Sequence, residues 1–205
     1  MSKSEIQSFL ARMRACELCR QAEKPLPHAP NPVFQMAPTA RILVAGQAPG
    51  NLANQTTKTF NDPSGVRLRD WMGIDDDIFY DARKVAVLPM GFCFPGYAPS
   101  GGDLPPRKEC APHWRQKALD YLPNIEVTLL IGGYAQAWHL KDRYQGSVTR
   151  TVEHWQDYAP SVFPVPHPSW RNNAWLKKHP WFETDLLPEL RAAIGRALSS
   201  SAAES

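Results

Sequence analysis

No stretch of this chain is apolar for long enough to cross a membrane. No window approaches the roughly 18 apolar residues that a transmembrane helix needs. The first residues, MSKSEIQSFLARMRAC, also lack the continuous apolar segment of a secretory signal. These two absences argue against a membrane protein and against export, so we expect a cytoplasmic protein.

An excess of charge of one sign is also missing. The chain has 23 Lys and Arg against 20 Asp and Glu, a net charge of +3 over 205 residues. This balance permits an anionic partner such as nucleic acid without demanding one. The length fits one domain with a proper core, which we place at residues 1–198, followed by a disordered tail at 199–205.

The chain lacks the best-known phosphate-binding signatures as well. The glycine-containing segment GQAPG, residues 46–50, has neither the lysine of a P-loop nor the spacing of a dinucleotide fingerprint. Its two glycines and proline directly follow an apolar run. They suit either an ordinary strand-to-helix turn or a tight loop whose backbone amides approach a ligand.

Proline, in contrast, is abundant. The 20 prolines are about twice the usual share and predict long, stiffened loops, which are candidate sites for function. Four compact apolar runs suit buried strands, at 42–45, 85–88, 127–131 and 162–165. Helical patterns lie between and around them, at 65–72, 110–122, 134–140 and about 181–198. An N-terminal helix is also expected, with a capping box made by Ser4 and Gln7.

This alternation predicts an α/β fold with three α/β/α layers and a four-stranded, mainly parallel central sheet. In such folds ligands bind at the carboxyl ends of the strands.

The four cysteines form two pairs. Cys16 and Cys19 have chelating spacing, and Cys93 and Cys110 bracket a Pro- and Gly-rich loop. In a reducing compartment, ligands or free thiols are favoured over disulfides. Four thiolates suit a 4Fe-4S cluster or a tetrahedral zinc, although zinc would be expected to show two tight pairs. Four independent core cysteines are the remaining alternative.

The segment VPHPSWRNN follows the fourth apolar run. Two prolines flank His167 and restrict its backbone, as in a rigid turn or in a site that holds an imidazole in one geometry. Trp170, Arg171 and Asn172 then supply a wedge, a cation and an amide, the side-chain types that enter a duplex and hold phosphates. Phe60 could stack on a planar ligand or belong to the core.

Taken in order, these motifs resemble the uracil-DNA glycosylase superfamily over roughly residues 16–190. The cysteine pattern and GQAPG are closest to the iron–sulfur (family 4) branch, whose first motif reads GEAPG. The HPSWRNN segment is more similar to the HPS-x-RN of the single-strand-selective branch.

The resemblance implies a DNA glycosylase of base-excision repair that hydrolyses the bond between the sugar and a flipped-out deaminated base, with uracil as the first candidate. It implies that His167 stabilises the departing base and that Gln47 orients the attacking water. The other implied sites are base contacts at Gly46, Ala48, Phe60 and Asn61; DNA contacts at Ser169, Trp170, Arg171 and Asn172; and a 4Fe-4S cluster on Cys16, Cys19, Cys93 and Cys110. The implied partner is DNA containing a damaged base, bound by a monomer.

One position departs from the family. Pro89 stands where the iron–sulfur branch has the asparagine that reads the uracil edge. Base reading could then fall to backbone groups or Asn61, or the preferred base could be a deaminated purine. Two alternatives remain open: a non-catalytic nucleic-acid-binding protein with the same fold, and an unrelated α/β hydrolase acting on nucleotides.

Overall fold

The computed structural model describes residues 2–99 and 101–202. Its central sheet contains β1 (Ile42–Ala45), β2 (Val85–Val87), β3 (Val127–Ile131) and β4 (Val162–Val165), in the order β2-β1-β3-β4. All three strand pairs are parallel. The predicted α/β fold is therefore confirmed, and three strands have their predicted bounds.

Within the described residues the chain forms nine α-helices: α1 (Lys3–Arg14), α2 (Asn51–Thr56), α3 (Pro63–Met72), α4 (Asp76–Phe79), α5 (Gln116–Leu119), α6 (Gly132–Leu140), α7 (Val148–Glu153), α8 (Asn173–Lys178) and α9 (Leu187–Ala202). The described part of the chain has no helix that is both long and apolar enough to cross a membrane.

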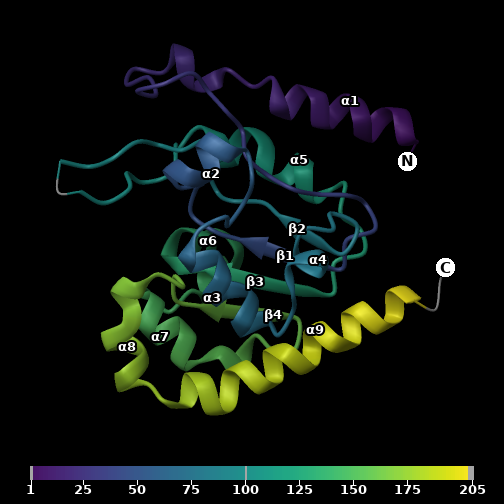
Figure 1. Cartoon of the computed structure of the whole chain (residues 1–205), viewed down its shortest axis with the longest axis vertical. Helices are drawn as coiled ribbons and strands as arrows, with labels where there is room; N and C mark the ends of the chain where they lie inside the picture. Colours follow the sequence, from purple (N-terminus) through teal and green to yellow (C-terminus); the bar gives the residue numbers. More distant parts are fainter. Residues whose placement is uncertain (1, 100, 203–205) are drawn as a thin grey trace.

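Successive strand residues point to opposite faces of the sheet, and each face has its own helices. Ile42 and Val44 pack in one cluster with residues of α3 and α9, whereas Leu43 packs in a second cluster with residues of α1 and α5. Figure 1 shows these helix pairs on opposite sides of the strands. The strands read as continuous apolar runs because both of their faces are buried.

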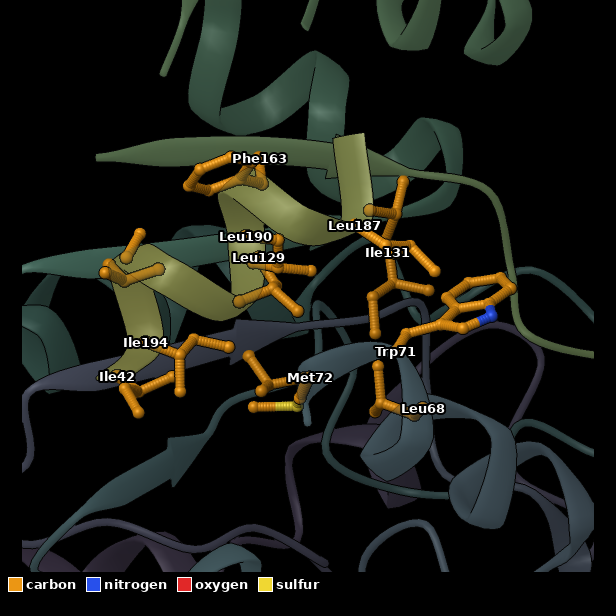
Figure 2. Close-up of a cluster of buried hydrophobic side chains, with 14 of the residues drawn as sticks. Ile42, Leu68, Trp71, Met72, Leu129, Ile131, Phe163, Leu187, Leu190 and Ile194 are labelled. Atoms are coloured by element: carbon orange, nitrogen blue, oxygen red, sulfur yellow. The ribbon is translucent and has the colours of Figure 1, made fainter. Parts of the chain in front are cut away.

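Helix α9 packs against the sheet in the first of these clusters, which is the larger of the two. Figure 2 shows three of its side chains, Leu187, Leu190 and Ile194, beside the strand residues Ile42, Leu129, Ile131 and Phe163. All seven are 3% exposed or less. The spacing of the α9 residues follows the helical period, so one face of this helix is buried against the sheet.

Several helix boundaries predicted from the sequence differ from those in the structure. The N-terminal capping box is made by Ser2 and Glu5, not by Ser4 and Gln7. Both pairs have the required spacing, but the carboxylate of Glu5 also interacts favourably with the positive end of the helix. The segment predicted as one helix at 110–122 begins with a π-helical turn, Ala111–Arg115. The chain is helical as far as Ala202, so the predicted boundary at 198 falls inside α9, and residues 203–205 lie outside the described residues.

Candidate functional site

A cavity of about 390 Å³ opens at the carboxyl-terminal edge of the sheet, where ligands of open α/β folds bind. Five residues proposed from the sequence line it: Gly46, Ala48, Phe60, Asn61 and His167. The loop after the first strand and the turn after the fourth therefore share one cavity. Its volume falls within the range of small-molecule pockets.

Phe60 forms a firmly held wall of this cavity. Its φ of 47° is in the left-handed region, which is uncommon for a bulky residue. Its carbonyl oxygen accepts hydrogen bonds from Nη1 of Arg69 (3.2 Å) and from the hydroxyl of Tyr80 (3.2 Å). Its ring meets that of Phe79 edge to face, with 6.3 Å between centroids. A ring held in this way presents a fixed surface on which a planar ligand could stack.

Gly65 is required by this arrangement, because a Cβ atom there would lie 1.8 Å from the carbonyl oxygen of Phe60. We expect Gly65→Ala to lower the free energy of unfolding by about 3 kcal/mol, the upper end of overpacking costs. Gly195→Ala is the matched control, because no heavy atom lies within 4 Å of its Cβ position in α9. There we expect a gain of up to about 1 kcal/mol from helix propensity. Urea unfolding followed by circular dichroism measures both values, and equal stabilities would contradict the steric argument.

His167 projects from a turn held by backbone contacts. Pro166 and Pro168 are buried on either side of it, and the side-chain amide of Asn172 donates a hydrogen bond to its carbonyl oxygen (2.7 Å). Burial lowers the pKa of the imidazole, while the negative charges of Asp62 and Asp103 oppose that shift. The ring is therefore neutral near pH 7 and carries one N–H. No described residue hydrogen-bonds to the ring, so this N–H can be offered to a ligand.

Two carboxylates that sequence reasoning did not assign to the site also line the cavity, Asp62 and Asp103. Asp62 caps α3: its carboxylate accepts hydrogen bonds from the Ser64 hydroxyl (2.8 Å) and the Gly65 amide (2.9 Å). Asp103 has no side-chain hydrogen bond to any described residue. Asp103 is exposed overall, but desolvation where its carboxylate lines the cavity raises its pKa, and Arg171 and a protonated His167 oppose the rise. The two carboxylates thus have different environments in one cavity.

Gln47 does not line this cavity. Its side-chain amide donates a hydrogen bond to the carbonyl oxygen of Leu104 (3.1 Å), and it borders a neighbouring depression instead. Gly46 and Ala48, on either side of Gln47, do line the cavity, so the side chain of Gln47 lies on the other side of this loop. The predicted role of Gln47 in orienting water does not fit this position.

The turn after His167 forms an exposed rim. Trp170 is 74% exposed, which is unusual for tryptophan. Nη2 of Arg171 donates to the carbonyl oxygen of Gly101 (3.4 Å), and Nη1 of Arg67 donates to that of Ser169 (3.2 Å). The amide of Asn172 is used inside the turn. Of the predicted DNA contacts, Trp170 is therefore the most available to a partner.

All four cysteines line a second, much smaller cavity of about 10 Å³. All four are free thiols. Two sulfurs accept hydrogen bonds, Cys110 from the Phe92 amide (3.4 Å) and Cys16 from Nε1 of Trp114 (3.1 Å). Burial raises the pKa of Cys93 and of Cys110 to about 12. Thiolates at these positions therefore require a nearby cation.

This cysteine cavity is compact but not a ready-made site for one ion. Within the described residues, no group of three or more His, Cys, Asp or Glu side chains is placed to hold a metal ion. The two Cys pairs nevertheless come together from segments that are far apart in the sequence, which four independent core cysteines would not require.

A buried cation lies behind the site, and nothing in the sequence pattern indicated it. Arg115 is 1% exposed, and its Nη1 donates to the carbonyl oxygens of Leu88 (2.8 Å) and Pro89 (3.1 Å). Its Nε donates to Nε2 of His139 (3.0 Å). Burial lowers the pKa of Arg115 to about 9 and that of His139 to about 3. Because Pro89 lines the larger cavity, Arg115 fixes part of the cavity wall from behind.

A comparison with protein families gives one match. The family model described as Uracil DNA glycosylase superfamily matches residues 33–191. The matched segment contains both loops of the cavity, Phe60, and the second pair of cysteines, whereas Cys16 and Cys19 precede it.

Proposed function

The chain belongs to the uracil-DNA glycosylase superfamily, and we propose that it is a DNA glycosylase that removes a deaminated base from DNA, with uracil as the first candidate. The observation that carries this proposal is the single cavity lined by Phe60, the GQAPG loop and His167. A fixed aromatic wall and a neutral imidazole facing one space are suited to bind a flat base and to stabilise it as it leaves.

In the proposed reaction the target nucleotide rotates out of the helix into the cavity, which costs a few kcal/mol and least in single strands or at mismatches. Its base stacks on Phe60. The glycosidic bond then breaks through an oxocarbenium-like sugar, as in other glycoside cleavages. Negative charge gathers on the departing base, where the N–H of His167 donates a hydrogen bond to it. A positioned donor of this kind contributes about 3–4 kcal/mol.

Base recognition must differ from that in the iron–sulfur branch, because Pro89 lines the cavity and has no side-chain donor. Three side-chain amides, those of Asn51, Gln55 and Asn61, line the same cavity and can read a base edge. We propose that Asn61, which directly follows the stacking ring, makes this contact. The amide of Asn61 donates only a 3.3 Å hydrogen bond to the Thr56 hydroxyl, which a base could replace.

At the rim, Trp170 is proposed to enter the space that the flipped nucleotide leaves. Large apolar side chains act as wedges between base steps in this way. Arg171 would meet the backbone phosphates beside it.

The cysteine cavity is proposed to hold a 4Fe-4S cluster on Cys16, Cys19, Cys93 and Cys110. A tetrahedral zinc with 2.3 Å bonds would require sulfurs about 3.8 Å apart. A cubane cluster binds each sulfur to a different iron atom and so does not need four sulfurs to converge on one ion. The four thiols line one cavity of about 10 Å³, so the loops that carry them would have to move apart to admit the cluster. The N–H groups aimed at two sulfurs suit cluster ligands. Hydrolysis of a glycosidic bond transfers no electron, so the cluster's contribution would be to join the N-terminal segment to the loop.

We expect protein purified without oxygen to be brown and to contain four iron and four sulfide per chain. Elemental analysis for iron and zinc, acid-labile sulfide, and the visible absorption spectrum measure this. Stoichiometric zinc, or neither metal after anaerobic purification, would contradict the assignment.

The function is tested with labelled oligonucleotides carrying uracil or hypoxanthine, single- and double-stranded, followed by alkaline cleavage of abasic sites. Strand breaks at the damaged base are expected with at least one substrate. Absence of breaks with all of them, together with salt-dependent DNA binding, would favour the second candidate, a non-catalytic nucleic-acid-binding protein. The observation that supports this second candidate is Pro89, which stands where the iron–sulfur branch has its base-reading asparagine.

A further inference from the structure

The loop between Cys93 and Cys110 carries a small hairpin beside the cavity. The Leu104 amide donates to the carbonyl oxygen of Gly96 (2.9 Å), and Tyr97 and Asp103 form an antiparallel bridge. Figure 1 shows this segment as the teal loop that projects from the body of the molecule. Both bridge residues line the cavity that contains His167.

Two motifs of the site hold this hairpin from different directions. Gln47, in the loop after β1, donates to the carbonyl oxygen of Leu104. Arg171, in the turn after β4, donates to that of Gly101. The first of these contacts is directly adjacent to Asp103. The position of Asp103 is therefore tied to the same two segments that form the proposed active site.

Asp103 is better suited to accept a proton than Asp62, the other carboxylate of the cavity. Hydrogen bonds from Ser64 and Gly65 stabilise the ionised form of Asp62 and so reduce its basicity. No described residue donates to the carboxylate of Asp103; the residue is exposed overall, and desolvation at the cavity raises its pKa. One of its oxygens lies 3.9 Å from the Cβ position of Gly50, so it faces the glycine loop.

We infer that Asp103 is the general base that activates the attacking water, and that Gln47 is a positioning residue that holds Asp103 through Leu104. This inference rests on the proposed glycosylase function. In the step, the carboxylate of Asp103 takes one proton from water, and the water oxygen forms a bond to C1′ of the sugar. The bond from C1′ to the base nitrogen breaks, and its electron pair leaves with the base, to which His167 donates a hydrogen bond. Asp103 then returns its proton to solvent.

The test is a comparison of single-turnover rates and their pH dependence. Asp103→Asn is expected to lower the rate of base release at least about 100-fold, within the range for general-base catalysis, with DNA binding unchanged. The acid limb of the pH profile is expected to become less steep. In the wild type Asp103 must be ionised to accept the proton, with a pKa shifted up from 3.8, and the variant lacks this requirement. Asp103→Glu should recover part of the rate, and Asp77→Asn on α4 is the exposed matched control.

Gln47→Ala provides a second readout. It is expected to slow base release about tenfold in the wild-type background and to have little further effect in Asp103→Asn, because both changes act on the same carboxylate. An active wild type whose Asp103→Asn variant keeps its rate and its pH profile overturns this inference alone. A wild type that releases none of the damaged bases overturns the proposed function, and this inference with it.

Discussion

Replacing His167 with alanine is expected to lower the rate of base release by about 10²–10³-fold, a loss of about 3–4 kcal/mol of transition-state stabilisation. The expectation follows from the neutral ring, which lines the cavity and whose N–H is not used by any described residue. The fold should survive, because the turn is held by Pro166, Pro168 and the hydrogen bond from Asn172 to a backbone oxygen, none of which needs the imidazole.

The pH dependence follows from the direction of the shift. Burial lowers the pKa of His167 below 6.5, so the ring stays neutral near pH 7 and becomes charged only as the pH drops through that lowered value. Because the charged ring still offers an N–H to the departing base, the loss of rate in His167→Ala is expected on both sides of that value. Single-turnover rates measured with His154→Ala as the exposed control would show whether the effect is specific. A His167→Ala variant within a few-fold of wild type would exclude leaving-group stabilisation by this residue.

The fold could be predicted from the sequence where burial determines the pattern of apolar residues. The four parallel strands are buried on both faces, so each reads as a short apolar run, and only β2 ends one residue earlier than expected. The short helices α2, α4, α7 and α8 were missed, since each has six residues or fewer and too little apolar periodicity to be distinguished from a loop.

The site was predictable to the extent that sequence motifs follow the ends of strands. Gly46 and His167 come directly after β1 and close behind β4, and parallel strands bring such positions to one edge. Asp103 could not be found in this way, because it reaches the cavity through a long loop whose path depends on tertiary contacts. The contact of Gln47 with Leu104 could not be predicted, because the sequence does not show to which side of a loop a side chain points.

No sequence pattern indicated that Arg115 is buried. Its removal is expected to have the largest effect on stability. We expect Arg115→Met to lower the free energy of unfolding by about 4 kcal/mol. The buried carbonyl groups of Leu88 and Pro89 would each lose their donor, at about 1–3 kcal/mol apiece. Chemical denaturation measures the loss. Arg83→Met is the matched control, because Arg83 is exposed and pairs only with Asp81 in its own turn, so little change is expected.

The pH dependence of stability distinguishes the effect of the charge of Arg115 from the effect of its hydrogen bonds. In the folded wild type His139 is kept neutral, with a pKa lowered to about 3 first by burial and then by the charge of Arg115. The unfolded chain binds a proton at this histidine below about pH 6.5, so its contribution to stability is lost progressively as the pH falls from there toward 3. Without Arg115 the pKa of His139 rises, so the decline should end at a higher pH and its total should be smaller than in the wild type. A decline of equal total size in both proteins would mean that Arg115 acts through its hydrogen bonds to the cavity wall and not through its charge.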